Sequence, residues 1–176
     1  MKHLLTVLMV LIFITIGCKK SSTNSDGDIS GTNTHVTVNV KTADEYFNFS
    51  TNSGSGDAAS AHDIVFYSVM WTPPGAPVTI NDPRFRVKDG LSIAVVDAEN
   101  LDDVTEVPAS EEFIENFVSE MGEWYYETSA HIILPSDNVY IVNTTDGKFP
   151  AFEIIKYFDE EGISGFFNIE WKYLSE

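Results

Sequence analysis

The chain has 176 residues, of which 43% are hydrophobic and 12% are aromatic, and it carries 10 Lys and Arg against 27 Asp and Glu for a formal net charge of −17. This length and apolar content suit one domain with a real core and exclude intrinsic disorder along the whole chain. The acidic charge makes nucleic acid a poor partner, because phosphate binding needs clustered Lys and Arg.

The first residues have the order of a secretory leader. Lys2 gives a basic start, residues 4–16 are almost purely apolar, and Gly17 precedes Cys18. The apolar run is too short to span a bilayer, which takes about 20 residues, but it fits the core of a signal peptide. A small residue directly before the cysteine resembles the cleavage box of bacterial lipoproteins, so we expect a signal peptide over 1–17 and lipidation of Cys18. An ordinary signal peptide with an incidental cysteine is the alternative.

The residues after Cys18 form a polar stretch that contains Gly and lacks apolar periodicity up to Thr34. Such a composition is typical of a flexible tether, so residues 18–34 are expected to join the lipid to a single domain over 35–176. Cys18 is the chain's one cysteine. Its lipidation leaves no thiol for a disulfide, a thiolate nucleophile or a zinc–sulfur site.

Short runs rich in β-branched and aromatic residues, separated by turn residues, predict a mainly antiparallel all-β domain. The expected strands are residues 35–40, Tyr46–Phe49, Asp63–Trp71, Leu91–Val96, Trp124–Glu127, His131–Leu134, Val139–Asn143, Phe152–Tyr157 and Phe166–Tyr173. Turns are expected at 51–60, at 73–75, at Asp146–Gly147 and at 159–162.

One short helix is expected over Ser110–Met121. Ser110 can cap its start, and the two glutamates that follow suit the positive end of a helix dipole. Its apolar residues fall on one face at helical spacing, and Gly122 is well placed to end it.

The sequence contains no nucleophile elbow, zinc-protease pair, phosphate loop, dinucleotide fingerprint or EF-hand loop. We therefore expect no enzyme. The side chains that could serve as axial ligands of a haem iron are few: His35, His62, His131, Met70 and Met121, together with the tyrosines. His131 follows an aromatic segment after a short polar connection, where a surface histidine is the common alternative.

The order of segments in the C-terminal half resembles the HmuY family, haem-binding lipoproteins of the Bacteroidota. Upstream, residues 63–66 resemble a strand of that family, with His62 in place of its usual Trp, and Val107–Pro108 matches a further position. The segments in the C-terminal half are Trp124–Tyr126, His131, Pro135, Val139–Val142, Thr145–Lys148, Phe152–Tyr157 and the closing strand to Tyr173.

This resemblance implies an all-β fold and a lipid-anchored lipoprotein of the outer membrane that takes part in iron acquisition. Exposure at the cell surface and orientation toward the periplasm are both open alternatives. The resemblance also implies capture of haem and its transfer to a TonB-dependent receptor. Family members hold haem iron between two axial histidines or two axial methionines, and His131 lies where the second ligand is expected. The aromatic residues that would line a haem slot are Trp71, Trp124, Tyr125 and Tyr126.

The chain departs from the family at the hairpin that carries the first ligand. Residues 109–123 are short and contain no histidine, so Met121 is the soft donor available there. Met121 also completes the apolar stripe of the expected helix, which makes core packing its alternative role, and Met70 could be core or could line the slot. Haem propionates would need a nearby cation from among Arg84, Arg86, Lys88, Lys148 and Lys156. A non-haem interaction module of the same fold, for a protein, glycan or other small ligand, remains the alternative function.

Overall fold

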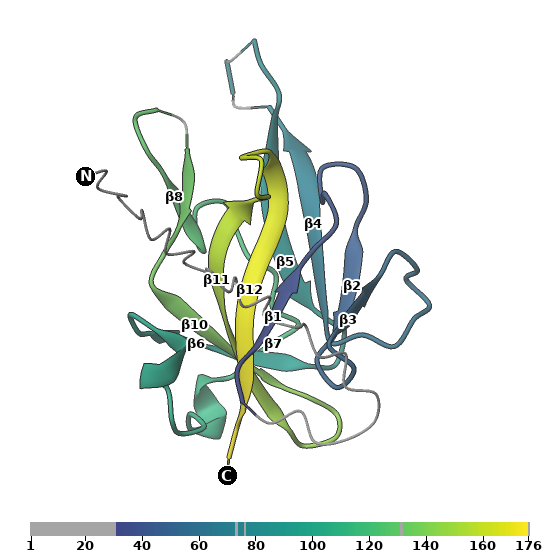
Figure 1. Ribbon diagram of the computed structural model, residues 1–176, viewed down its shortest axis with the longest axis vertical. Helices are drawn as coiled ribbons and strands as arrows, with labels where there is room; N and C mark the ends of the chain where they lie inside the picture. Colours follow the sequence, from purple (N-terminus) through teal and green to yellow (C-terminus); the bar gives the residue numbers. More distant parts are fainter. Residues whose placement is uncertain (1–30, 73, 76, 131, 176) are drawn as a thin grey trace, which may run out of the picture.

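The computed structural model describes residues 31–72, 74–75, 77–130 and 132–175. They form a mainly antiparallel β structure in which two sheets face each other (Figure 1). The all-β fold class expected from the sequence is confirmed. The leader, Cys18 and most of the expected tether lie outside the described residues, and the first strand begins at Asn33.

The larger sheet has six strands, and its first and last members in the chain lie side by side. Their order across the sheet is β1 (Asn33–Val36), β12 (Ser164–Leu174), β11 (Phe149–Phe158), β10 (Asn138–Asn143), β6 (Ser92–Asp97) and β7 (Ile114–Glu115). Gly147 takes a positive φ of 74° in the tight turn between β10 and β11, as the Asp146–Gly147 pair predicts.

The smaller sheet has four strands, and a separate two-stranded hairpin lies beside β11 of the larger sheet. The order in the smaller sheet is β3 (Ser53–Ser55), β2 (Glu45–Asn48), β4 (Ile64–Trp71) and β5 (Ile80–Val87). The hairpin pairs β8 (Tyr125–Glu127) with β9 (Ile133–Pro135). Pro83 sits within β5, which is an edge strand of its sheet, where a missing backbone donor is tolerated.

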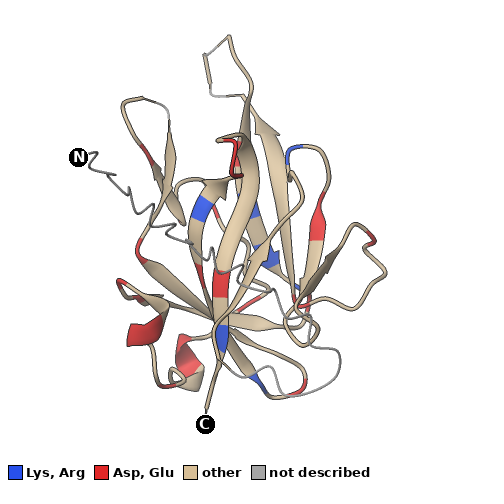
Figure 2. Ribbon diagram, viewed as in Figure 1, with Lys and Arg blue, Asp and Glu red and all other residues tan. Residues whose placement is uncertain are grey.

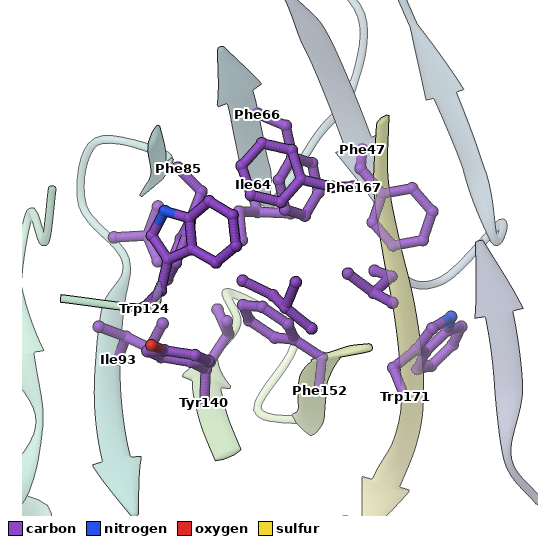
Figure 3. Packing of buried hydrophobic residues seen from close by; sticks show 14 of the residues in the cluster. Phe47, Ile64, Phe66, Phe85, Ile93, Trp124, Tyr140, Phe152, Phe167 and Trp171 are labelled. Carbon is purple, nitrogen blue, oxygen red and sulfur yellow. The ribbon is translucent and has the colours of Figure 1, made fainter. Parts of the chain in front are cut away.

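The space between the two sheets is filled largely by aromatic rings (Figure 3). Phe66 from β4 lies 4.9 Å, between ring centroids, from Phe167 of β12, and Phe85 of β5 lies 4.9 Å from Tyr140 of β10 in an edge arrangement. Edge-to-face pairs of this kind add about 0.5–1.5 kcal/mol each beyond simple burial. The alternating pattern along each strand thus provides one wide aromatic core.

A second, smaller core covers the opposite face of the larger sheet. Val139 and Ile141 of β10 point to this face, where they pack with Leu101 and Val104. Leu101 belongs to the short 3-10 turn η1 (Leu101–Asp103), and a second such turn, η2 (Ser110–Glu112), follows it. The segment between β6 and β7 therefore acts as a cover for the sheet.

The prediction of a helix over Ser110–Met121 is wrong. Only η2 is helical there; β7 follows, and Asn116 takes a positive φ of 52° that turns the chain. Phe117 and Ser119 are buried while Val118 between them is exposed, which is the period of an extended chain. The free edge of β5 provides the reason, since the Ser119 amide donates to the Phe85 carbonyl at 2.9 Å and the Ser119 hydroxyl accepts from the Phe85 amide at 2.9 Å.

Candidate functional site

Three chain reversals gather at one end of the molecule, at the top of Figure 1. They are the β4–β5 connection, the β8–β9 connection and the β11–β12 turn, and we call this region the hairpin end. In the β8–β9 connection, the Thr128 amide donates to the Ile132 carbonyl at 2.9 Å, so the two sides of the hairpin stay paired close to its tip. The hairpin end is thus built from ordered strands that extend past the core.

A buried carboxylate fastens the β8–β9 hairpin to β5. Asp82 is fully buried; the Tyr125 hydroxyl donates to its Oδ1 at 3.0 Å, and Arg84 Nε donates to its Oδ2 at 2.7 Å. Burial, together with the adjacent Asp82 carboxylate, raises the pKa of Tyr125, so its hydroxyl stays protonated and keeps donating. The hydrogen bond to Asp82 likewise raises the pKa of Arg84.

Trp124 strengthens the same attachment from the core side. Its Nε1 donates to the Pro83 carbonyl at 2.9 Å, and its ring packs against Phe167 at 4.8 Å and Tyr157 at 5.7 Å. The Tyr157 hydroxyl is buried and has no hydrogen-bond partner among the residues that the structure describes, and burial raises its pKa. The base of the hairpin is therefore packed into the aromatic core.

Above this base, the strands expose apolar side chains instead of burying them. The exposed large apolar residues there are Met70, Val78 and Ile80 on the β4–β5 hairpin, Tyr126, Ile132 and Leu134 on the β8–β9 hairpin, and Ile163 in the β11–β12 turn. Tyr126 and Leu134 are paired across β8 and β9, so they share one face of the hairpin. Exposed apolar surface concentrated in this way is typical of a binding site.

Met70 shows how the surface arises. Along β4, side chains alternate, so Met70 lies on the same face as the core residues Ile64 and Phe66. Yet Met70 is 65% exposed, because it stands beyond the part of β4 that the facing sheet covers. Its thioether is therefore accessible on the core-facing side of an uncovered strand.

The structure places the other expected site residues at different depths. Trp124 and Tyr125 are buried and support the hairpin, whereas Tyr126 is exposed and Trp71 is partly exposed. Met121 lies in a turn before β8 and is 38% exposed, so it is not a core residue of a helix. His131, the expected axial ligand, and Cys18, the expected lipid site, lie outside the described residues.

Two of the remaining histidines have structural partners. His35 Nε2 contacts the buried Glu45 carboxylate and its ring packs on Phe47 at 4.4 Å, which ties β1 to β2. His62 Nδ1 lies 2.8 Å from the Ser60 carbonyl, and its ring meets the Tyr46 ring edge-on. Neither is on the strands of the hairpin end.

The cations expected to balance an anionic ligand are unevenly placed. Lys148 pairs with Asp146 at 3.4 Å in the β10–β11 turn, away from the hairpin end, and Arg84 is held by Asp82. Lys156 is exposed near the end of β11 and forms no ion pair with an acid of the described residues. Lys156 is thus one cation available to a negative group there. Lys41, whose Nζ donates to the Ser164 hydroxyl at 2.5 Å beside the β11–β12 turn, is another.

The sequence did not reveal the Asp82 attachment, because β5 was not among the expected strands. Its charged residues and Pro83 hide the alternation that predicts a strand. In the part of the chain that the structure describes, no group of three or more His, Cys, Asp and Glu side chains could hold a metal ion, and no helix is long and apolar enough to cross a membrane.

No family model matches the chain, and no curated protein matches it. Solved structures do. A candidate lipoprotein from Bacteroides fragilis has a TM-score of 0.57 at 15% identity, covering 86% of this chain and 94% of its own. A candidate HmuY-like haem-binding protein from Bacteroides vulgatus has a TM-score of 0.54 at 15% identity, covering 82% and 93%.

The apo form of an HmuY analogue from Tannerella forsythia has a TM-score of 0.52 at 9% identity and covers 85% of this chain and all of its own. At such identities the likeness shows the fold alone. The structural likeness extends over almost the full length of each solved structure. The resemblance in the order of sequence segments likewise covers most of the domain. The chain has the HmuY-like fold.

Proposed function

We propose that this protein is a lipid-anchored surface protein of the outer membrane that captures haem at the hairpin end and passes it to a TonB-dependent receptor. The observation that carries the proposal is the exposed apolar surface of two hairpins that are rigidly held at their base. Haem is a large apolar plane, and burial of such a plane between apolar side chains supplies most of its binding free energy. Two solved structures of the same fold, the candidate HmuY-like haem-binding protein from Bacteroides vulgatus and the HmuY analogue from Tannerella forsythia, support this choice of ligand.

His131 and Met70 are the axial ligands that we propose, with Met121 as the alternative to Met70. Imidazole and thioether are both established ligands of haem iron. Met70 is exposed on the core-facing side of β4, and Met121 lies in the turn that leads into β8. Tyr126 and Trp71 are the accessible aromatic residues for contact with the ring, and Lys156 is the cation that we assign to a propionate.

The test is a haemin titration of a chain that begins at Lys19, read by visible absorption in the oxidised and reduced states. This chain keeps every described strand and both cores. We expect a saturable one-to-one shift to a six-coordinate, low-spin spectrum. His131→Ala should abolish that spectrum, and Met70→Leu should change its ligand-dependent bands.

His62→Ala is the matched control, because it removes a histidine that lies on none of the hairpin-end strands and should leave the spectrum unchanged. If Met70→Leu has no effect and Met121→Leu does, Met121 is the ligand. Weak, non-saturating adsorption of haemin by the unaltered chain would refute haem capture.

Attachment to the membrane rests on Cys18 and has its own test. In cells that express the full chain, Cys18→Ser should move the protein from the membrane fraction to the soluble fraction and remove incorporation of a labelled fatty acid. Ser21→Ala, which lies in the same polar stretch, should change neither. Unaltered membrane attachment in Cys18→Ser would show that the lipid is not the anchor.

One observation favours a second function. The β11–β12 turn contributes Asp159, Glu160 and Glu161 to the hairpin end, and negative charge there repels the two propionates of haem. A non-haem ligand, such as a protein or glycan, would not meet this repulsion. The charge-neutralising triple variant at these three positions distinguishes the two, since it should tighten haemin binding if haem is the ligand.

A further inference from the structure

A cavity lies on the outer face of the larger sheet. The strands that line it, β6, β7 and β10, lie in the lower half of Figure 1, away from the hairpin end. The cavity has a volume of about 290 Å³. One wall comes from the strands β6, β7 and β10, and the other from the segment that leads into η2 and from the start of β11. Its lining residues are Ser92, Val107, Pro108, Ser110, Phe113, Glu115, Asn143 and Phe149.

Three polar side chains form a row along the strand wall. Asn143 on β10 is the register partner of Ser92 on β6, and Ser92 is in turn the partner of Glu115 on β7. Residues directly opposite each other in antiparallel strands point to the same face, with Cβ atoms about 4.5–5.5 Å apart. An amide, a hydroxyl and a carboxylate therefore stand side by side.

The opposite wall is aromatic and fixed in place. The rings of Phe113 and Phe149 lie 6.0 Å apart at 57°, and both pack against the second core, which Val139 and Ile141 of β10 build. Side chains held by a core lose little freedom when a ligand binds, so the cavity is preorganised. The faces of aromatic rings also attract cations.

The surroundings of the cavity are strongly negative. No Lys or Arg occurs between Asp89 and Gly147. Figure 2 shows acidic residues on the short helical turns η1 and η2. The acidic residues from the end of β6 to β7 are Asp97, Glu99, Asp102, Asp103, Glu106, Glu111, Glu112 and Glu115. The field of such a cluster concentrates positive ligands at the cavity.

Two cations of the larger sheet and its β10–β11 turn lie beside acids outside the cavity. Lys172 Nζ lies 3.5 Å from Asp102, and Lys148 Nζ lies 3.4 Å from Asp146 and 5.2 Å from the centre of the Tyr173 ring. Glu115 forms no ion pair with any Lys or Arg in the described ranges of the chain. The Glu115 carboxylate, at the wall of an aromatic cavity, therefore has no Lys or Arg counter-ion among the described residues.

We propose that this cavity binds a small organic cation that carries a guanidinium or primary ammonium group. Glu115 is its counter-ion, the Asn143 side-chain carbonyl and the Ser92 hydroxyl accept its remaining N–H donors, and the rings of Phe113 and Phe149 cover its apolar carbons. An anionic ligand is repelled by the same field, and a neutral one gains nothing from Glu115.

The test is a calorimetric titration of the chain that begins at Lys19 with agmatine at low ionic strength. Agmatine carries both cationic groups on a four-carbon linker; 1,4-butanediol and glutarate are the neutral and anionic comparison probes. We expect saturable one-to-one binding of agmatine and of neither comparison probe. Glu115→Gln should weaken agmatine binding at least tenfold.

Glu99→Gln is the matched control. It removes the same charge from the same acidic segment at an exposed position that does not line the cavity, and we expect less than a twofold change. Equal weakening by both variants would show that only the general field attracts the ligand and would overturn the site. Absence of saturable binding to the unaltered chain would overturn it as well. Haemin binding by Glu115→Gln should stay unchanged, which separates this result from the haem proposal.

Discussion

The interior between the two sheets and the hairpin end use similar side chains in opposite ways. In the interior, strands of both sheets overlap, and residues such as Phe66 and Phe152 lose all contact with water. At the hairpin end, β4 and β8 continue past that overlap, and Met70 and Tyr126 remain exposed. The same alternating pattern therefore provides stability where a facing sheet covers it and an accessible apolar surface where none does.

The largest expected effect comes from emptying the interior. Phe66→Ala removes a ring that packs against Phe85, Phe152 and Phe167, and it should lower the free energy of unfolding by about 3–5 kcal/mol. Met70→Ala, on the same face of the same strand, should change it by less than about 0.5 kcal/mol. Chemical denaturation of both variants measures the contrast, and similar losses would show that Met70 is covered in solution.

A smaller effect is expected at the attachment between the two regions. Asp82→Asn weakens the bonds from Arg84 and Tyr125, and it should cost about 2 kcal/mol because hydrogen bonds to a buried charge are involved. Tyr125→Phe removes only one bond and should cost about 1 kcal/mol. Hydrogen exchange of the β8–β9 amides should accelerate in both variants, more so in Asp82→Asn. Exchange that does not change would mean that Trp124 alone holds the hairpin.

The hairpin surface itself should affect binding and not stability. The double variant Tyr126→Ser and Leu134→Ser removes a cross-strand apolar pair and should weaken haemin binding at least about tenfold, since burying one such side chain is worth about 1.5–3 kcal/mol. Ile114→Ser is the control, because Ile114 is equally exposed on β7 but lies outside the hairpin end. Equal affinities of the double variant and the unaltered chain would place the haem elsewhere.

The smallest effect concerns pH. Burial raises the pKa of Asp63, so the folded state binds its proton more tightly than the unfolded chain does. The contribution of Asp63 to stability is therefore fully present below its unfolded pKa of 3.8 and is lost as pH rises through the higher folded pKa. In Asp63→Asn, the amide oxygen can still accept from the Phe49 amide, a bond of 3.0 Å in this structure.

The measurement compares the stability of Asp63→Asn with that of the unaltered chain across this pH range. The free energy of unfolding of the variant, relative to that of the unaltered chain, should increase as pH rises from about 4 toward neutrality. A stability difference that stays constant with pH would contradict a raised pKa.

The sequence predicts most of the interior but less of its edges. β12 alternates clearly between buried and less buried residues, because one of its faces meets the main core. β4 and β10 are instead continuous runs of β-branched and aromatic residues, and β10 is buried on both faces. β5 escapes prediction because Asp82, Pro83 and Arg84 belong to an attachment that exists only after the hairpin docks. The false helix over Ser110–Met121 arises because a free strand edge, which no local pattern shows, competes with helical hydrogen bonds.

The sequence predicts which residue types form the candidate site but not which of these side chains are buried. The residue types that suit haem were identified from the sequence, yet burial separates Trp124 from Tyr126, two positions apart on one segment. Only the tertiary contacts with Pro83 and Phe167 decide which aromatic ring supports the hairpin and which meets solvent. The cavity beside η2 depends on strand register, which the local sequence does not determine.

The edge strands of the two sheets are unusually short or blocked. β7 has two residues and β3 has three, β5 carries Pro83, and the chain around Val118 lies along the outer side of β5. An unprotected edge offers free amide and carbonyl groups to a neighbouring copy and so promotes aggregation by strand addition. Molecules crowded together on a surface meet edge to edge far more often than molecules in dilute solution. Brief, interrupted edges allow such crowding without growth of intermolecular sheets.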